Sequence, residues 1–443
     1  MRVLFTVLGE RSMFESMVPL AWALRTAGHE VRVACQPDLV DHVTWSGLSA
    51  VPVGRDHVLW KLVNRRPRLR DDVREDQFPP FDKGDAPVGE LTLGHLQAGY
   101  DTMVPWMFRP VNEAIIEDLV AFSRAWRPDL VMWEPRTFAG AVAAETVGAL
   151  HARMLWGVDY FARLRGHYLR LAAERPEEAG PDALADWLSR VAERHGVAFD
   201  ETMTHGHFTI DQLPPSLRLD VEGPDYLSMR YVPYNGRSVT PPWLWAPPER
   251  PRVCLTLGVS AMGRAYGYSV SAGELVESLA ELDAEIVATV AEKEQDALGT
   301  LPDNVRVESF VPLHALLPHC DAVVHHGGFG STNTALIEGV PQLVLAQQFD
   351  APAKARLIDE QGAGLRIPTA ETTGPLVRDG VRRLLSEPGF ARNAGRLRQE
   401  VLDQPTPNGL VEELERRVAL HGGGSAAAPA AASGVPGDTA AIR

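Results

Sequence analysis

Several features are scarce in this 443-residue sequence, and each scarcity excludes a class of protein. Basic residues are in deficit, with 43 Lys and Arg against 58 Asp and Glu, and the formal net charge of −15 argues against binding to nucleic acid or to an anionic membrane. No apolar run reaches membrane-spanning length, and the apolar start at residues 1–8 is too short for a signal peptide. We therefore expect a cytoplasmic protein with neither nucleic acid nor a membrane as its partner.

Cysteine and metal motifs are scarce as well. The three cysteines, Cys35, Cys254 and Cys320, are far apart, match no disulfide or metal spacing, and lie in or beside apolar runs, so we expect buried reduced thiols. No Asp-rich metal motif, Walker loop or dinucleotide fingerprint is present. The sequence thus predicts neither a metal nor a cofactor.

The chain is long enough for two domains, and its pattern predicts two α/β units. Residues 2–8 and 30–35 are expected strands around a helix at 17–27, which is a doubly wound opening. A proline-rich stretch at 213–251 precedes a second strand-then-turn start at 252–258. We therefore predict a first domain at 1–215, a linker at 216–250 and a second domain at 251–400. A helical segment at 401–421 and a disordered Gly/Ala/Pro/Ser-rich tail at 422–443 follow.

The strongest single motif is a glycine-rich turn between a buried strand at 322–324 and a helix. Gly327, Gly328 and Gly330 allow a sharp turn close to a ligand, and Ser331 or Thr332 is the expected N-cap. Free amides and the helix dipole favour a phosphate group at this point. A plain tight connection is the alternative. A His-His pair at 325–326 precedes the turn, and polar residues at 347–350 follow the next strand.

These residues resemble a known family. The run 325–364 resembles the nucleotide-sugar signature of family 1 glycosyltransferases with the GT-B fold. Residues 18–24, 27–33 and 229–236 carry a narrower resemblance, over residues 1–420, to actinomycete transferases that attach deoxysugars to polyketide antibiotics. The resemblance implies two Rossmann-like doubly wound domains facing across a cleft, with the last helices crossing back to the first domain.

The resemblance also implies the reaction and its partners. The expected enzyme transfers a deoxysugar, aminodeoxysugars included, with inversion from a dTDP-sugar to a polyketide aglycone of macrolide or anthracycline type, without a metal. A helper that resembles a haem monooxygenase is an expected partner, docked on the polar loop at 55–89 and nearby helices. The alternative interpretation of that loop is a solvated mobile segment without a function of its own. A homodimer is a further expected assembly.

The resemblance assigns donor-site roles residue by residue. His326 and Ser260 contact the diphosphate, and Phe310 and Val311 hold the base. Histidines are often half-buried, so apart from the resemblance we expect His325 to be structural and to pack beneath the turn. Asp350 holds sugar hydroxyls, and Ala351 stands where relatives carry an amide, which indicates a deoxysugar unless Gln347 or Gln348 replaces that amide. The diphosphate donors are expected from the turn and the helix start, namely Gly327, Gly328, Gly330, Ser331 and Thr332.

The sequence departs from the family at the general base, because Met13 occupies the position of the usual histidine. Three explanations stay open. A carboxylate replaces the histidine: Glu134, made more basic by apolar surroundings at Trp133, or else Glu15. Alternatively the acceptor is an acidic phenol or a carbon nucleophile that needs little help. In the third explanation the chain is an impaired paralogue that binds a nucleotide sugar and supports another transferase.

Aromatic residues of the first domain are candidates for a flat, apolar acceptor cleft, and at least half of them fit a plain core equally well. An epimerase would need acid/base residues on both sides of the sugar, and the sequence offers no such set. The candidates for the acceptor cleft are Phe14, Trp60, Trp106 and Trp156.

Overall fold

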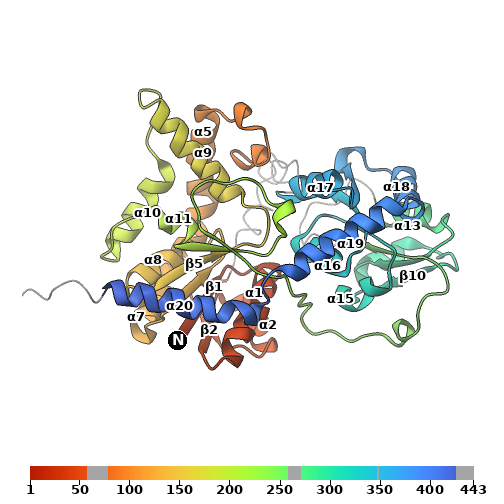
Figure 1. Ribbon diagram of the computed structural model, residues 1–443, viewed down its shortest axis with the longest axis horizontal. Helices are drawn as coiled ribbons and strands as arrows, with labels where there is room; N and C mark the ends of the chain where they lie inside the picture. Colours follow the sequence, from red (N-terminus) through yellow and green to blue (C-terminus); the bar gives the residue numbers. More distant parts are fainter. Residues whose placement is uncertain (57–77, 258–270, 347–348, 426–443) are drawn as a thin grey trace, which may run out of the picture.

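The computed structural model describes residues 1–56, 78–257, 271–346 and 349–425. Two parallel sheets, each flanked by helices, form two domains joined by the segment that follows the first sheet (Figure 1). This confirms the prediction of two Rossmann-like doubly wound domains. None of the helices in these ranges combines the length and hydropathy needed to cross a bilayer.

The first sheet has seven strands in the order β3-β2-β1-β4-β5-β6-β7, all paired in parallel. Because the carboxyl ends of parallel strands share one edge, the loops after β1, β4 and β5 lie next to each other. The sequence patterns did not predict β6 and β7, and β7 extends the first sheet past residue 215 into the expected linker. The strands are β1 Arg2–Val7, β2 Glu30–Cys35, β3 Ala50–Pro52, β4 Leu130–Trp133, β5 Leu150–Met154, β6 Phe208–Asp211 and β7 Tyr226–Ser228.

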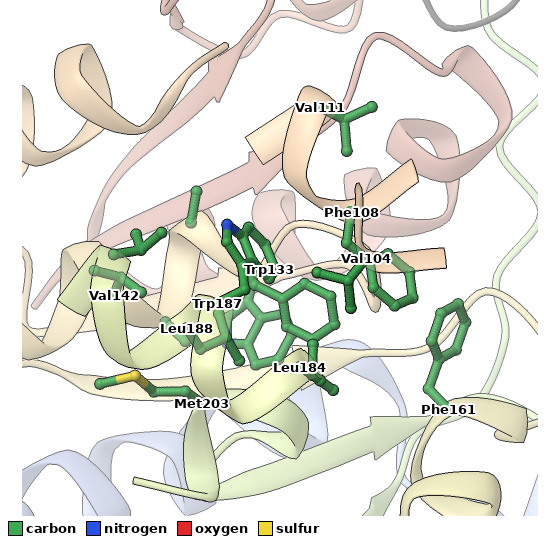
Figure 2. Close-up of a cluster of buried hydrophobic side chains, with 14 of the residues drawn as sticks. Val104, Phe108, Val111, Trp133, Val142, Phe161, Leu184, Trp187, Leu188 and Met203 are labelled. Atoms are coloured by element: carbon green, nitrogen blue, oxygen red, sulfur yellow. The ribbon is translucent and has the colours of Figure 1, made fainter. Parts of the chain in front are cut away.

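Helices cover both faces of this sheet. Figure 2 shows one of the two cores, where Trp133 of β4 meets Phe108, Val142 and Trp187 from three helical segments. The sequence patterns predicted neither the helices between residues 93 and 113 nor α9. The helices are α1 Arg11–Thr26, α2 Val40–Trp45, α5 Leu93–Met103, the π-helix η4 Val104–Phe108, α6 Arg109–Glu113, α7 Ile116–Trp126, α8 Ala139–Glu145, α9 Tyr160–Glu174, α10 Ala183–Arg194 and α11 Thr202–His205.

The second sheet has six parallel strands in the order β10-β9-β8-β11-β12-β13. Its strands are β8 Arg252–Thr256, β9 Glu285–Thr289, β10 Val305–Glu308, β11 Ala322–His325, β12 Gln342–Ala346 and β13 Gly364–Pro368. Its helices are α13 Ala272–Ala280, α14 Glu292–Gln295, α15 Leu313–Leu316, α16 Phe329–Glu338, α17 Ala351–Glu360, α18 Gly374–Ser386 and α19 Pro388–Asp403.

The last helix, α20 Pro407–Ser425, returns to the first domain and lies along α1 (Figure 1). Leu410, Val411 and Leu414 are buried in the same cluster as the apolar face of α1, which explains why the chain crosses back. The helix continues to Ser425, so the tail predicted from 422 begins as helix, and residues 426–443 lie outside the described ranges.

Candidate functional site

The glycine-rich turn connects β11 to α16 at the carboxyl edge of the second sheet. Gly327 has φ +82°, a conformation that favours glycine, and a Cβ there would also press on Ala351. The N-cap is Gly328, and α16 begins at Phe329. The predicted cap at Ser331 or Thr332 is therefore wrong. Gly327 and Gly328 reverse the chain direction within two residues, so α16 begins before Ser331 and Thr332.

His325 and His326 have different surroundings. His325 is fully buried beneath the turn, where Nδ1 accepts the amide N–H of Gly327 at 3.0 Å and Nε2 lies 2.8 Å from Gln342 Oε1. Burial, the larger effect, lowers the pKa of His325 to about 4 although its bond to Gln342 opposes the shift. The half-buried His326 ring fills the space that a Cβ on Gly328 would take. Gly328 thus lets an imidazole lie directly over the start of α16.

The first turn of α16 presents donors to a ligand. The amides of Phe329, Gly330 and Ser331 have no intrahelical acceptor, because the first amides of any helix lack one. Thr332 differs: its amide donates to Gly328 O at 2.9 Å and its side chain is fully buried. The structure therefore does not turn Thr332 toward a ligand.

Two further predicted donor-site residues lie in the loop between β10 and α15. Phe310 is 40% exposed, whereas Val311 is buried. An exposed ring on this loop is available to stack on a nucleobase, while Val311 can offer only its backbone. Ser260 lies outside the described residues, as do Gln347 and Gln348.

Asp350 connects the two domains. Its Oδ2 accepts the amide N–H of Val158 at 2.8 Å, and its Oδ1 lies 2.9 Å from Nζ of Lys354, one turn along α17. All three residues are buried, and a Cβ on Gly157 would collide with the Asp350 carboxylate. The predicted sugar-binding carboxylate is therefore tied to the loop after β5 of the first domain.

Phe349 inserts beside this contact into an aromatic cluster of the first domain. Its backbone has φ +50°, which is uncommon for a residue other than glycine. Its ring centroid lies 5.4 Å from Trp156, 5.5 Å from Tyr160 and 5.7 Å from Phe161. The ring of Phe81 completes the cluster at 5.5 Å. Tertiary packing thus holds the strained residue next to Asp350.

The start of α1 and the loops after β4 and β5 bring together Met13, Glu134, Arg136 and Trp156. Met13 is 6% exposed, and its Sδ lies 3.0 Å from Nη2 of Arg136. The guanidinium of Arg136 also lies over the Trp156 ring, 5.5 Å from its centroid. The position of the expected base is therefore filled by a thioether next to a buried cation.

Glu134 is fully buried but lies in polar surroundings, contrary to the apolar setting expected from Trp133. Its carboxylate accepts the Thr137 hydroxyl at 2.6 Å, Trp156 Nε1 at 2.8 Å and the Arg136 amide at 3.1 Å. The indole N–H of Trp133 points instead to His151. These three donors occupy both carboxylate oxygens and fix the orientation of the Glu134 side chain.

Glu15, the second candidate base, is half-buried on α1. Its Oε1 accepts from Arg11 Nε at 2.7 Å. Burial raises the pKa of Glu15, and Arg11 opposes that shift. A Cβ on Gly236 would lie 3.3 Å from Glu15 Oε1, which places this carboxylate beside the interdomain connection.

The predicted acceptor residues have separate locations. Phe14 is 1% exposed within the core beneath α1, so its assignment to a cleft is wrong. Trp106 is half-buried on η4 at the edge of the other core, and Trp156 is half-buried in the Phe349 cluster. Trp60 lies outside the described residues.

Within the described ranges, one group could hold a metal ion: the ligand atoms of Glu145, His151 and His207 lie within 4.8 Å of one another. His151 Nδ1 accepts from Trp133 Nε1, and His207 Nδ1 accepts from the His151 amide, both at 3.3 Å. Each neutral ring therefore carries its proton on Nε2, facing Glu145. A metal would need those Nε2 lone pairs, so the group fits a hydrogen-bond network better than a metal site.

Sequence reasoning missed Arg136, Lys354 and Val158. Arg136 follows β4 and Met13 follows β1, and these two strands are neighbours in the sheet. The order of the strands, which the sequence does not show, was therefore the missing information. Lys354 had a local signal, since it follows Asp350 at the helical spacing of four residues. Val158 contributes a backbone amide, for which sequence carries no signal.

Comparisons with known proteins agree with this architecture. The family described as erythromycin biosynthesis protein CIII-like matches residues 22–258 with its N-terminal domain and residues 273–417 with its C-terminal domain. A 10-deoxymethynolide desosaminyltransferase of Streptomyces venezuelae is 48% identical over 95% of this chain and 98% of its own. An aclacinomycin-T 2-deoxy-L-fucose transferase of Streptomyces galilaeus is 45% identical over 95% and 97%, respectively.

A solved structure shows the same fold. The glycosyltransferase VinC, determined in complex with dTDP, is 41% identical and superimposes with a TM-score of 0.84, covering 95% of this chain and all of its own. The predicted GT-B fold is thereby confirmed. The chain belongs to the erythromycin biosynthesis protein CIII-like family of GT-B glycosyltransferases.

Proposed function

We propose that this glycosyltransferase moves a deoxysugar from a dTDP-sugar to a polyketide aglycone with inversion at the anomeric carbon. Relatives named for transfer of desosaminyl and 2-deoxy-L-fucose groups support the sugar class, and the dTDP complex of VinC supports the nucleotide. The named acceptors of relatives, 10-deoxymethynolide and aklavinone among them, support a macrolide or anthracycline aglycone.

One observation carries the proposal. The start of α16, with the His326 ring over Gly328, offers amides and a helix dipole to a diphosphate. Phe349 and Asp350 follow β12, the next strand after α16. They contact Trp156 and Val158 of the first domain, respectively. A donor bound at α16 therefore has its sugar directed to the contact between the domains, where an acceptor can reach it.

The local packing supports a donor with few hydroxyls. Ala351 is buried, and its Cβ lies 2.7 Å from where a Gly327 Cβ would stand. The side chain of Ala351 offers no polar atom to a sugar hydroxyl. Asp350 is then the carboxylate that we assign to the remaining sugar hydroxyls.

A dTDP titration tests the donor site. We expect His326→Ala to weaken dTDP binding about tenfold, equivalent to about 1.4 kcal/mol, because one donor to the diphosphate is lost. His167→Ala on α9, a half-buried histidine of the first domain, is the matched control and should bind as the wild type does. Unchanged dTDP affinity in His326→Ala would contradict the assigned donor site.

A second function is favoured by Met13, which cannot take a proton. In that alternative the chain binds a nucleotide sugar and supports another transferase without turnover of its own. It would bind dTDP normally and form no glycoside with any acceptor of a panel. Glycoside formation by Met13→His but not by the wild type would support this alternative.

Three expectations about assembly and location are part of the proposal. We expect a helper protein that resembles a haem monooxygenase, and copurification at micromolar concentration tests it. Sedimentation of the pure protein tests the expected homodimer. Fractionation of producing cells tests the expected cytoplasmic location.

A further inference from the structure

The edge of the Trp156 ring is held by a buried carboxylate. Its indole Nε1 donates to Oε2 of Glu134, a fully buried residue, at 2.8 Å. Both carboxylate oxygens are engaged, because Oε1 accepts the Thr137 hydroxyl at 2.6 Å and Oε2 also accepts the Arg136 amide at 3.1 Å. A general base must lie within hydrogen-bond reach of the proton that it takes. A carboxylate engaged in this way is better suited to orienting its neighbours.

The same carboxylate also acts on the face of the indole. The guanidinium of Arg136 lies 5.5 Å from the centroid of the Trp156 ring, within the range of a cation–π interaction. That guanidinium forms an ion pair with Glu134, with 3.9 Å between Nε and Oε2. Glu134 therefore holds Trp156 in two ways, directly at the indole N–H and indirectly through Arg136.

Trp156 nevertheless stays half-buried, and it packs against both cores of the first domain. Arg136 links it to Met13, at the position of the family's base, since Met13 Sδ lies 3.0 Å from Arg136 Nη2. The Phe349 ring of the second domain lies 5.4 Å from the indole centroid. Asp350, the proposed sugar ligand, comes next in the chain. The indole is thus in contact with groups that adjoin both the expected base position and the expected sugar position.

We propose that Trp156 is a contact residue for the acceptor and that Glu134 is the positioning residue that fixes its ring; the inference rests on the function proposed above. The apolar surface of the aglycone packs on the exposed part of the indole. An indole offers a large rigid surface with few rotatable bonds, which suits an aliphatic macrolide and a flat anthracycline alike. In this role Glu134 shapes the acceptor site and takes no proton from the acceptor.

Glu134→Gln separates positioning from proton transfer. A glutamine oxygen at the place of Oε2 still accepts the indole N–H, and its NH2 group can donate to the Thr137 hydroxyl, which accepts as well as donates. We expect kcat and the KM for the acceptor to stay within about threefold of the wild type, with an unchanged profile of kcat/KM between about pH 6 and 9. A loss of roughly 10²–10⁴-fold, as for removal of a general base, would overturn the inference.

Trp156→Phe and Trp156→Leu test the indole itself. Phenylalanine keeps an aromatic ring but loses the N–H and part of the surface, and leucine loses the ring. We expect the KM for the acceptor to rise roughly tenfold in Trp156→Phe and roughly 10²-fold in Trp156→Leu. The KM for the dTDP-sugar should stay within about threefold. A rise confined to the KM for the dTDP-sugar would overturn the inference, because the indole would then serve the donor.

A double variant tests whether Glu134 acts through Trp156. Glu134→Asp keeps the charge beside Arg136 but withdraws the carboxylate from the indole by one methylene. It should raise the KM for the acceptor about tenfold when Trp156 is present, and less than about twofold in Trp156→Leu, where no indole remains to be oriented. Equal fold-changes in the two backgrounds would overturn the positioning role. If Glu134→Gln fails to fold, this comparison decides.

Trp126→Leu is the matched control. Trp126 is also half-buried, stacks on Phe122 at 5.6 Å and lies 5.9 Å below the guanidinium of Arg32. It ends α7 just before β4, at the amino edge of the sheet and opposite to the proposed site. The kinetics of Trp126→Leu should match those of the wild type.

The assay uses a dTDP-deoxysugar and a panel of macrolide and anthracycline aglycones, and the variants are measured with the aglycone that gives the highest wild-type kcat/KM. No transfer to any aglycone of the panel would overturn the proposed function and this inference together. Transfer by the wild type with an unchanged acceptor KM in Trp156→Leu would overturn the inference alone and leave the transferase intact.

Discussion

The Oδ2 atom of Asp350 accepts the amide N–H of Val158 at 2.8 Å, so a carboxylate of the second domain is held by the backbone of the first domain. The contact requires Gly157, because a Cβ there would collide with the carboxylate. A sugar hydroxyl that binds Asp350 must therefore share or replace this bond. Under the proposed role of Asp350 as the sugar ligand, donor binding and the contact between the domains are coupled at this one side chain.

Asp350→Asn tests that coupling. An amide keeps the shape of the side chain but loses its charge. We expect the rate of sugar transfer to fall by about 10²-fold, which is a typical loss when a substrate is misplaced. Affinity for dTDP, which has no sugar, should stay within twofold. Steady-state kinetics and calorimetric titration with dTDP measure the two quantities.

The matched control is Asp359→Asn on the same helix, whose carboxylate forms a half-exposed ion pair with Arg366 at 3.5 Å. It should leave both quantities unchanged. Equal loss of transfer in both variants would point to damage of α17 rather than to loss of a sugar contact.

Lys354→Met tests the buried ion pair that orients Asp350. Lys354 is 1% exposed, and its removal leaves the Asp350 carboxylate without its cation, so we expect the free energy of unfolding to fall by about 3–5 kcal/mol. Urea denaturation measures the change.

Pairing this variant with Asp350→Asn completes a double-mutant cycle. The double variant should lose less than the sum of the single losses, by about 0.5–3 kcal/mol. Additive losses would show that the two side chains do not interact. Lys83→Met is the control, because its ammonium forms one long bond within the described part of the chain, to Glu90 O at 3.5 Å.

His325 should make stability depend on pH. Burial lowers its pKa from 6.5 to about 4 in the folded state, so between these values the unfolded chain binds the extra proton. Stability from this group is complete above pH 6.5 and is lost as pH falls to 4, by about 3 kcal/mol in total.

His325→Gln should remove that part of the pH dependence. Denaturation at pH 7 and at pH 4 should show a smaller loss in the variant than in the wild type. His207, whose pKa burial also lowers to about 4, is present in both proteins and cancels in the difference. Equal losses would mean that His325 is not neutral in the fold.

Leu414→Ala tests whether α20 is part of the first domain. Leu414 is fully buried in the cluster beneath α1, so its truncation should cost about 2–5 kcal/mol in the free energy of unfolding. Leu420→Ala, on the same helix but 63% exposed, should change stability by less than about 0.5 kcal/mol. Similar effects of the two variants would argue against this docking.

The donor half of the site was largely predictable. The strand, the glycines and the following helix lie within 20 residues of each other, and local rules place amides at a helix start whichever fold surrounds it. The position of His325 beneath the turn was predicted from the usual half-burial of histidine, and the structure confirms it. The predicted N-cap was wrong because Ser and Thr are more frequent N-caps than Gly. In this turn the chain reverses at Gly327, and the His326 ring lies against Gly328, so the helix begins earlier than predicted.

The sequence by itself determined two doubly wound domains, a glycine turn that fits a diphosphate, and the loss of the usual base at Met13. Only the tertiary structure decided what surrounds Met13. Strand order sets β4 beside β1 and β5, and this brings Arg136, Glu134 and Trp156 from distant segments to one edge. Residues 123 positions apart, such as Met13 and Arg136, meet through packing that no local pattern encodes.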